Sequence, residues 1–271
     1  MNGNIVKLAC VLIGVSLGCI SLMGQDVKGA KAVQAALNQK WERQRNSFIL
    51  STGPSIPDAR FSVKDPPLVG KGYGYAMTGR TFDLRYSHYI DEGISLTASL
   101  EHKYFGIDYE RYNRALNMDQ NSPIKGSSVS FPGKKGFWSE GWNILALAIG
   151  PSYRYGVSSQ LYLETYILVG LANSYIPAIS ISTAGDDGKY ADFITMGREN
   201  KRVFYTKMMV AMTYLLSESV FLSCGFGSTD DIGPSFTGHD FTFNEDGSRT
   251  PKKTNYSMTS FDLSVGIGYS F

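Results

Sequence analysis

Three histidines are the side chains of this sequence best suited to acid–base chemistry, and they are His88, His102 and His239. A hydrolase that uses a hydroxyl, a histidine and a carboxylate needs the three groups within hydrogen-bond reach of one another. Ser87 and His88 are sequence neighbours, and neighbouring side chains of a strand point to opposite faces. His102 is expected near the far end of the same hairpin, and His239 in a distant loop. We therefore predict no catalytic residues and expect the protein not to be an enzyme.

Acidic side chains in the polar stretches could support other chemistry, either a protease at one rim or a Ca²⁺ site built from oxygen ligands. These candidates are Asp186, Asp187, Asp230, Asp231 and Asp240, the last beside His239. Segments 183–192 and 244–248 lack the spacing of an EF-hand loop, and loop carboxylates are usually solvated. The glycines of 70–79 precede a strand rather than a helix, unlike a phosphate-binding loop. With no Cys/His cluster for zinc, we expect no metal and no cofactor.

Charged residues also recur at alternate positions of strand-like segments, and opposite charges fall where they could meet. The pattern contains Asp83, Arg85, Glu101, Lys103, Arg154, Glu164, Lys207 and Asp262. A turn at residues 91–93 would place Asp83 opposite Glu101. Arg85 and Lys103 would then lie diagonal to these two carboxylates. The following hairpin would place Arg154 opposite or diagonal to Glu164. Because buried charges persist only when paired and hydrogen-bonded, this pattern predicts an ion-pair network.

The N-terminus has the pattern of an export signal. One lysine precedes an apolar or small run over 8–20, and the small residue Gly24 precedes Gln25. The run is too short for a membrane-spanning helix, which needs about 20 residues. We therefore predict that residues 1–24 are a signal peptide. A small residue followed by Gln resembles export signals frequent in Bacteroidota.

Residues 25–45 are the one helical-looking stretch, because Val33, Leu37 and Trp41 recur at i+4 spacing among Ala, Gln and Lys. We predict a periplasmic segment with a short helix. A frayed or loosely docked terminus is the favoured interpretation. A plug and a partner-binding arm are the alternatives.

Composition favours an all-β protein of one main domain, residues 46–271. The chain has 29 Gly and 13% aromatic residues, typical of β structure. Its 26 Lys+Arg nearly balance 24 Asp+Glu, so charge gives no argument for a nucleic-acid partner. Beyond the signal the single cysteine is Cys224, which excludes an internal disulfide.

Alternation with period 2 predicts eight strands without helices between them. They span about 46–54, 75–90, 94–106, 142–156, 160–174, 203–216, 219–229 and 256–271. Short and long connections alternate along the chain. In an up-and-down barrel this puts three tight turns and both chain ends at one rim, and four long polar loops at the other. Membrane barrels show this asymmetry.

The two faces of the strands differ in bulk, which orients the barrel. An eight-stranded barrel is just wide enough for its side chains to fill. Rows of Ser, Gly and Ala fit that interior, whereas rows of Leu, Ile, Phe and Tyr would overfill it. The bulky rows are therefore predicted to face outer-membrane lipid, and the charged residues to face a closed lumen. A soluble calycin-like barrel with an apolar ligand inside is the opposite arrangement.

The last strand carries a family resemblance. Residues 264–271, SVGIGYSF, resemble the β-signal of bacterial outer-membrane barrels, with Gly266, Tyr269 and Phe271 at its motif positions. The resemblance implies that the barrel-assembly machinery recognises this strand. With this terminal motif and its alternating short and long connections, the chain resembles OmpA-type eight-stranded barrels of Gram-negative bacteria over about 46–271.

The sequence therefore predicts an all-β protein, an eight-stranded antiparallel up-and-down transmembrane β-barrel with a short N-terminal helix, located in the cell outer membrane. We expect a structural or surface-interaction role through the long external loops, with an envelope or extracellular partner that the sequence does not identify. A subunit of an envelope secretion or assembly complex, or a small-solute porin, is the alternative.

Overall fold

The computed structural model describes residues 27–58, 61–62, 76–108, 110–111, 128–130, 141–177, 179–184, 190–196, 199–232, 235–243, 249–255 and 258–271. The predicted signal peptide, 1–24, lies outside the described residues. Among those described, no helix is long and apolar enough to cross a membrane.

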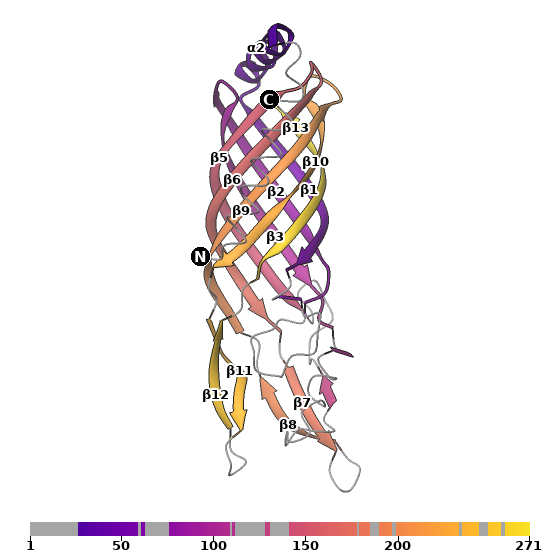
Figure 1. Cartoon of the computed structure of the whole chain (residues 1–271), viewed down its shortest axis with the longest axis vertical. Coiled ribbons are helices and arrows are strands. Elements are labelled where there is room, and N and C mark those ends of the chain that lie inside the picture. Colours follow the sequence, from indigo (N-terminus) through magenta and orange to yellow (C-terminus); the bar gives the residue numbers. More distant parts are fainter. Residues whose placement is uncertain are drawn as a thin grey trace.

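Eight strands close into one antiparallel barrel in the order β1-β13-β10-β9-β6-β5-β3-β2 (Figure 1). These strands are β1 (Asn46–Pro57), β2 (Gly79–Asp91), β3 (Ile94–Phe105), β5 (Trp142–Gly156), β6 (Leu161–Ile176), β9 (Glu199–Leu215), β10 (Val220–Ile232) and β13 (Ser260–Ser270). β1 pairs with both β2 and β13, so the first and last barrel strands close the sheet. The predicted fold class, with its short helix, is confirmed.

Tight turns join β2 to β3, β5 to β6 and β9 to β10 at one rim. The β2–β3 turn uses two left-handed residues, Glu92 with φ 47° and Gly93 with φ 87°. A side chain at Gly93 would also place a Cβ 2.5 Å from the carbonyl oxygen of Arg154, so glycine suits both the backbone and the packing. The resulting register places Asp83 opposite Glu101, as predicted.

The long connections at the other rim, predicted as polar loops, contain further strands beyond the predicted eight. β4 (Ser128–Ser130), β7 (Ile179–Ala184) and β8 (Tyr190–Met196) form a three-stranded sheet. β11 (Ser235–Phe243) and β12 (Arg249–Asn255) form a separate hairpin sheet. Both project beyond the barrel at the end opposite the helix (Figure 1).

Helix α2 (Val27–Arg43) lies across the rim of the tight turns (Figure 1). Lys40 and Arg43 occupy its last turn, where positive charge complements the helix dipole. Leu37 and Trp41 are 2% and 3% exposed. The favoured prediction of a frayed or loosely docked terminus was therefore wrong, because one face of the helix buries its apolar side chains against the barrel.

Candidate functional site

The barrel carries its bulky apolar side chains outside and its small or polar side chains inside. All eight barrel strands contribute exposed apolar residues, for example Leu50 at 60%, Leu147 at 63% and Leu171 at 62% exposure. The inward positions of the same strands include Ser51 and Ala148, both buried. The soluble alternative with an apolar interior is therefore contradicted.

Lys103 of β3 lies in the outer part of the lumen, on the side of the long connections, and is the centre of its polar contacts. Its Nζ lies 2.6 Å from Asp262 Oδ2 of β13 and donates to Ser260 Oγ at 2.9 Å. Thr229 of β10 accepts a further hydrogen bond from this ammonium group, and Ser55 of β1 donates to Asp262. β2 and β1 separate β3 from β13 in the barrel, so this pair crosses the lumen.

Lys207 of β9 links the middle of the lumen. Its Nζ lies 2.8 Å from Asp83 Oδ2 of β2 and 3.3 Å from Glu101 Oε1 of β3. β9 and β2 are diametrically opposite, with three strands between them on either side. The two carboxylates are held further by Ser99, which donates to Asp83 at 2.6 Å, and by Tyr205, which donates to Glu101.

Glu164 of β6 forms salt bridges with two guanidinium groups in the inner part of the lumen, on the side of the tight turns. Arg154 Nε lies 3.1 Å from Glu164 Oε1, and Arg85 Nη2 lies 3.4 Å from Oε2. Arg154 also donates to Ser47 Oγ at 3.0 Å. The guanidinium of Arg85 lies over Tyr166, 4.4 Å from the ring centroid, which adds a cation–π contact between two buried side chains.

All eight charged residues predicted to line the lumen are buried and lie in this network. The structure differs from the sequence pattern in how they connect. Asp83 and Glu101 are neighbours in register, yet Lys207 from the far wall bridges them. Lys103 lies 3.9 Å from Glu101 of its own strand, whereas the predicted pair Arg154 and Glu164, directly opposite in register, is present at 3.1 Å.

Sequence reasoning missed two interior residues, Tyr205 and Asp231. The acid pair 230–231 was expected in a loop, but β10 continues to Ile232, which corrects that placement. Asp231 is 1% exposed and accepts a hydrogen bond from Ser174 at 2.5 Å. The period-2 alternation of the strand could have predicted this inward position, since Asp231 follows the inward-facing Thr229 by two positions.

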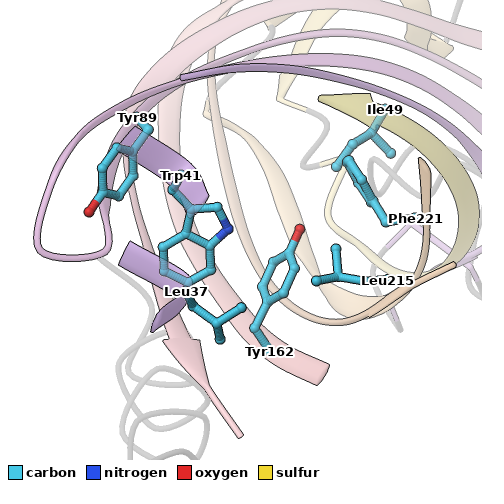
Figure 2. Close-up of a cluster of buried hydrophobic side chains, with 7 residues drawn as sticks. All are labelled: Leu37, Trp41, Ile49, Tyr89, Tyr162, Leu215 and Phe221. Carbon is cyan, nitrogen blue, oxygen red and sulfur yellow. The ribbon is translucent and has the colours of Figure 1, made fainter. Parts of the chain in front are cut away.

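Apolar residues close the inner end of the lumen (Figure 2). Trp41 of α2 lies between Tyr89 and Tyr162, with ring centroids 5.8 Å and 5.4 Å away. The guanidinium of Arg154 lies 5.8 Å from the Trp41 ring, so the helix meets the charged network directly. On the same helix, burial lowers the pKa of Lys40, and the nearby carboxylate of Glu218 partly offsets this.

An aromatic cluster occupies the outer end. Phe61 packs edge-on against Phe105 and Trp142, with centroid distances of 5.1 Å and 5.4 Å. All three side chains are at most 4% exposed. The described lumen is thus bounded by apolar packing at both ends, with charged residues between.

Two of the residues considered for catalysis, His88 and His102, have described side chains. His88 and His102 lie outside the lumen and hydrogen-bond the side chains of Asn46 and Asn143. The side chains of His239 and Asp240, and residues 186–187, are outside the described set. Among described residues, no three His, Cys, Asp or Glu side chains gather in a group that could hold a metal ion.

The residues of the predicted assembly signal lie at the seam where the barrel closes. Gly266 pairs with Ser51 of β1, and a Cβ there would lie 2.7 Å from the carbonyl oxygen of Leu50. Phe271 stacks on Phe48 and on Tyr269, at centroid distances of 5.9 Å and 6.2 Å. The exposed aromatic rings therefore join β1 and β13 on the outer face.

No protein-family model matches the chain, and no curated protein matches it. Solved barrel structures are similar to it. Ail, the attachment invasion locus protein of Yersinia pestis, is 10% identical, with a TM-score of 0.40 over 84% of this chain and 99% of that chain. Neisserial surface protein A is 10% identical, with a TM-score of 0.41 over 83% of this chain and 97% of that one. The outer membrane protein OprG from Pseudomonas aeruginosa is 12% identical, with a TM-score of 0.42 over 84% and 97%. At these values the likeness concerns barrel shape alone, and the closure of this barrel is established by its own strand register.

Proposed function

We propose that the chain is an outer-membrane β-barrel protein of Gram-negative bacteria. The observation that carries the proposal is the outward apolar surface, to which all eight barrel strands contribute. Soluble monomers rarely expose apolar patches beyond a few hundred Å². Lipid satisfies such a surface, and a closed barrel leaves no unpaired strand edge within the bilayer.

The lumen is proposed to be closed to solutes. Ion pairs cross it at three levels, centred on Lys103, Lys207 and Glu164. Eight-stranded barrels leave little space beyond their own side chains. These observations favour a stabilising interior over the small-solute porin, which would need a continuous water path between the ion pairs.

The role is proposed to lie in surface interactions through the long connections, without catalysis. Two small sheets, β4-β7-β8 and β11-β12, extend this rim beyond the barrel. The alternative, a subunit of an envelope secretion or assembly complex that uses α2, is less favoured. The apolar face of α2 is already buried against the barrel, so a partner would have to bind its opposite face.

Electrophoresis in SDS tests the membrane barrel. Closed membrane barrels resist cold SDS, so the unboiled protein from detergent-extracted envelopes is expected to migrate differently from the boiled protein. The same mobility in both lanes, with the protein in the soluble fraction, would contradict the proposal.

Exchange of the connections tests the role. Replacing residues 179–196 and 235–255 with short turns should leave the mobility shift intact and abolish binding to target cells or surfaces. Deleting residues 25–45 is the matched comparison. If that deletion, rather than the exchange, removes the bound partner while the mobility shift remains, the envelope-complex alternative is correct.

A further inference from the structure

Helix α2 packs into an apolar cluster at the inner mouth, to which five of the eight barrel strands contribute. The cluster that buries Leu37 and Trp41 contains Ile49 of β1, Tyr89 of β2, Tyr162 of β6, Leu215 of β9 and Phe221 of β10 (Figure 2). In an open sheet these strands would be spread over its full width. The apolar site for the helix therefore exists in full only when the barrel is closed.

Gln44, which follows the helix, spans the closing seam. Its side-chain amide donates to Ser219 Oγ at 3.2 Å, just before β10, and its carbonyl accepts from Ser270 Oγ of β13 at 3.0 Å. Two residues later, Asn46 exchanges backbone hydrogen bonds with Phe271 at 3.0 Å and 2.9 Å. The chain that leaves α2 is thus bonded to the last strand before it enters β1.

Gln34 holds the other side of the mouth. Its carbonyl oxygen accepts from the backbone N–H of Gly156 at 2.6 Å, and its amide donates to the carbonyl of Arg154 at 3.4 Å. Both acceptor and donor belong to the end of β5, far from the seam in the strand order. Gln34 and Gln44 therefore tie the helix to opposite parts of the rim.

We propose that α2 is a latch that docks after the barrel has closed and holds the β1–β13 seam shut. A group that binds only the closed state stabilises that state, because opening the seam must first release it. Interactions formed after the folding transition state slow unfolding and leave the folding rate unchanged. The latch therefore has a kinetic signature that distinguishes it from an early folding element.

The main test compares Trp41→Ala with Gln39→Ala, a substitution on the exposed face of the same helix. Folding and unfolding rates are measured on chains from residue 25 onward, in lipid vesicles, by the fraction that resists cold SDS. Trp41→Ala should speed unfolding by about 100-fold or more with an unchanged folding rate, and Gln39→Ala should change neither. If Trp41→Ala slows folding by the same factor, or leaves unfolding unchanged, the latch is wrong.

A milder variant keeps the test valid if Trp41→Ala does not fold. Gln44→Ala removes only the two hydrogen bonds at the seam and should speed unfolding about threefold to tenfold. Limited trypsin digestion then reports docking directly, since Lys40 and Arg43 lie in α2. Gln44→Ala should speed cleavage at these sites, because an undocked helix unfolds more readily, while the barrel remains SDS-resistant. Equal cleavage of the variant and the parent chain, with equal unfolding rates, would exclude the latch.

Discussion

Glu164 is the carboxylate shared by the two buried guanidinium groups at the inner end of the lumen. Arg85 and Arg154 are 4% and 3% exposed, and both contact it. Such pairs add little stability over apolar packing, but breaking one leaves a charge buried without compensation. At the scale of the residue, the lumen is therefore most sensitive to loss of a shared partner.

Replacing Glu164 with Gln should lower the free energy of unfolding by about 3–5 kcal/mol, because both guanidinium groups lose their counter-charge. Urea unfolding in vesicles, followed by tryptophan fluorescence, measures the loss. Glu110→Gln is the control, since Glu110 is exposed. A change below 1 kcal/mol in the Glu164 variant would mean that water already solvates this part of the lumen.

Gly268 of β13 is required for packing rather than for a turn. A Cβ at this position would lie 2.2 Å from the Phe221 ring and 2.8 Å from the carbonyl oxygen of Phe48. Gly268→Ala should destabilise the barrel by about 1–3 kcal/mol through overpacking. In Gly106→Ala, the matched control, the new Cβ would be 3.8 Å from Met77 Sδ and should cost less. Equal unfolding midpoints for the two variants would contradict this packing.

At the scale of the element, the alternating side chains of each barrel strand face the lumen on one side and the apolar outer surface on the other. In β10, Ser223 and Gly225 point inward, whereas Cys224 between them is exposed on the outer face. The same parity continues to Asp231, which is why that carboxylate enters the lumen.

Cys224 is a natural probe of this outer face. In chains from residue 25 onward, folded in vesicles, a membrane-impermeant maleimide should leave Cys224 unlabelled, because lipid covers it. Moving the cysteine to the exposed turn, as Ser217→Cys with Cys224→Ser, should give full labelling. Rapid labelling of Cys224 in the folded barrel would place β10 in water and overturn the lipid-facing assignment.

At the scale of the whole molecule, closure brings residues from opposite walls into contact. Lys207 and Asp83 meet across the full width of the barrel, 2.8 Å apart. The outer aromatic cluster and α2 lie at the two ends of this charged interior. The barrel is therefore filled along its length in the described residues.

Planar-bilayer recordings test this filling. The purified barrel should show no steady conductance at moderate voltage, because the crossing ion pairs occupy the section of the lumen. A general porin inserted under the same conditions is the positive control. Uniform, long-lived current steps from this barrel would mean that a water path passes the ion pairs, as the porin alternative requires.

The sequence by itself determined the eight barrel strands and their two faces. Period-2 alternation is a local property, so the inward position of residues such as Glu101 and Lys103 follows from parity once one face is recognised as too bulky for the lumen. The β2–β3 register followed from its short turn, because a tight hairpin leaves little freedom in pairing. The alternation of short and long connections likewise predicted which connections lie at each rim of the barrel.

Only the tertiary structure decided which groups meet across the barrel. Lys207 pairs with Asp83, 124 residues away in sequence, because closure brings β9 opposite β2. The docking of Trp41 was equally hidden, since the two rings that it contacts, Tyr89 and Tyr162, come from β2 and β6, which are not adjacent in the sheet. Local pattern specifies faces and turns, whereas contacts across the lumen depend on the curvature and closure of the whole sheet.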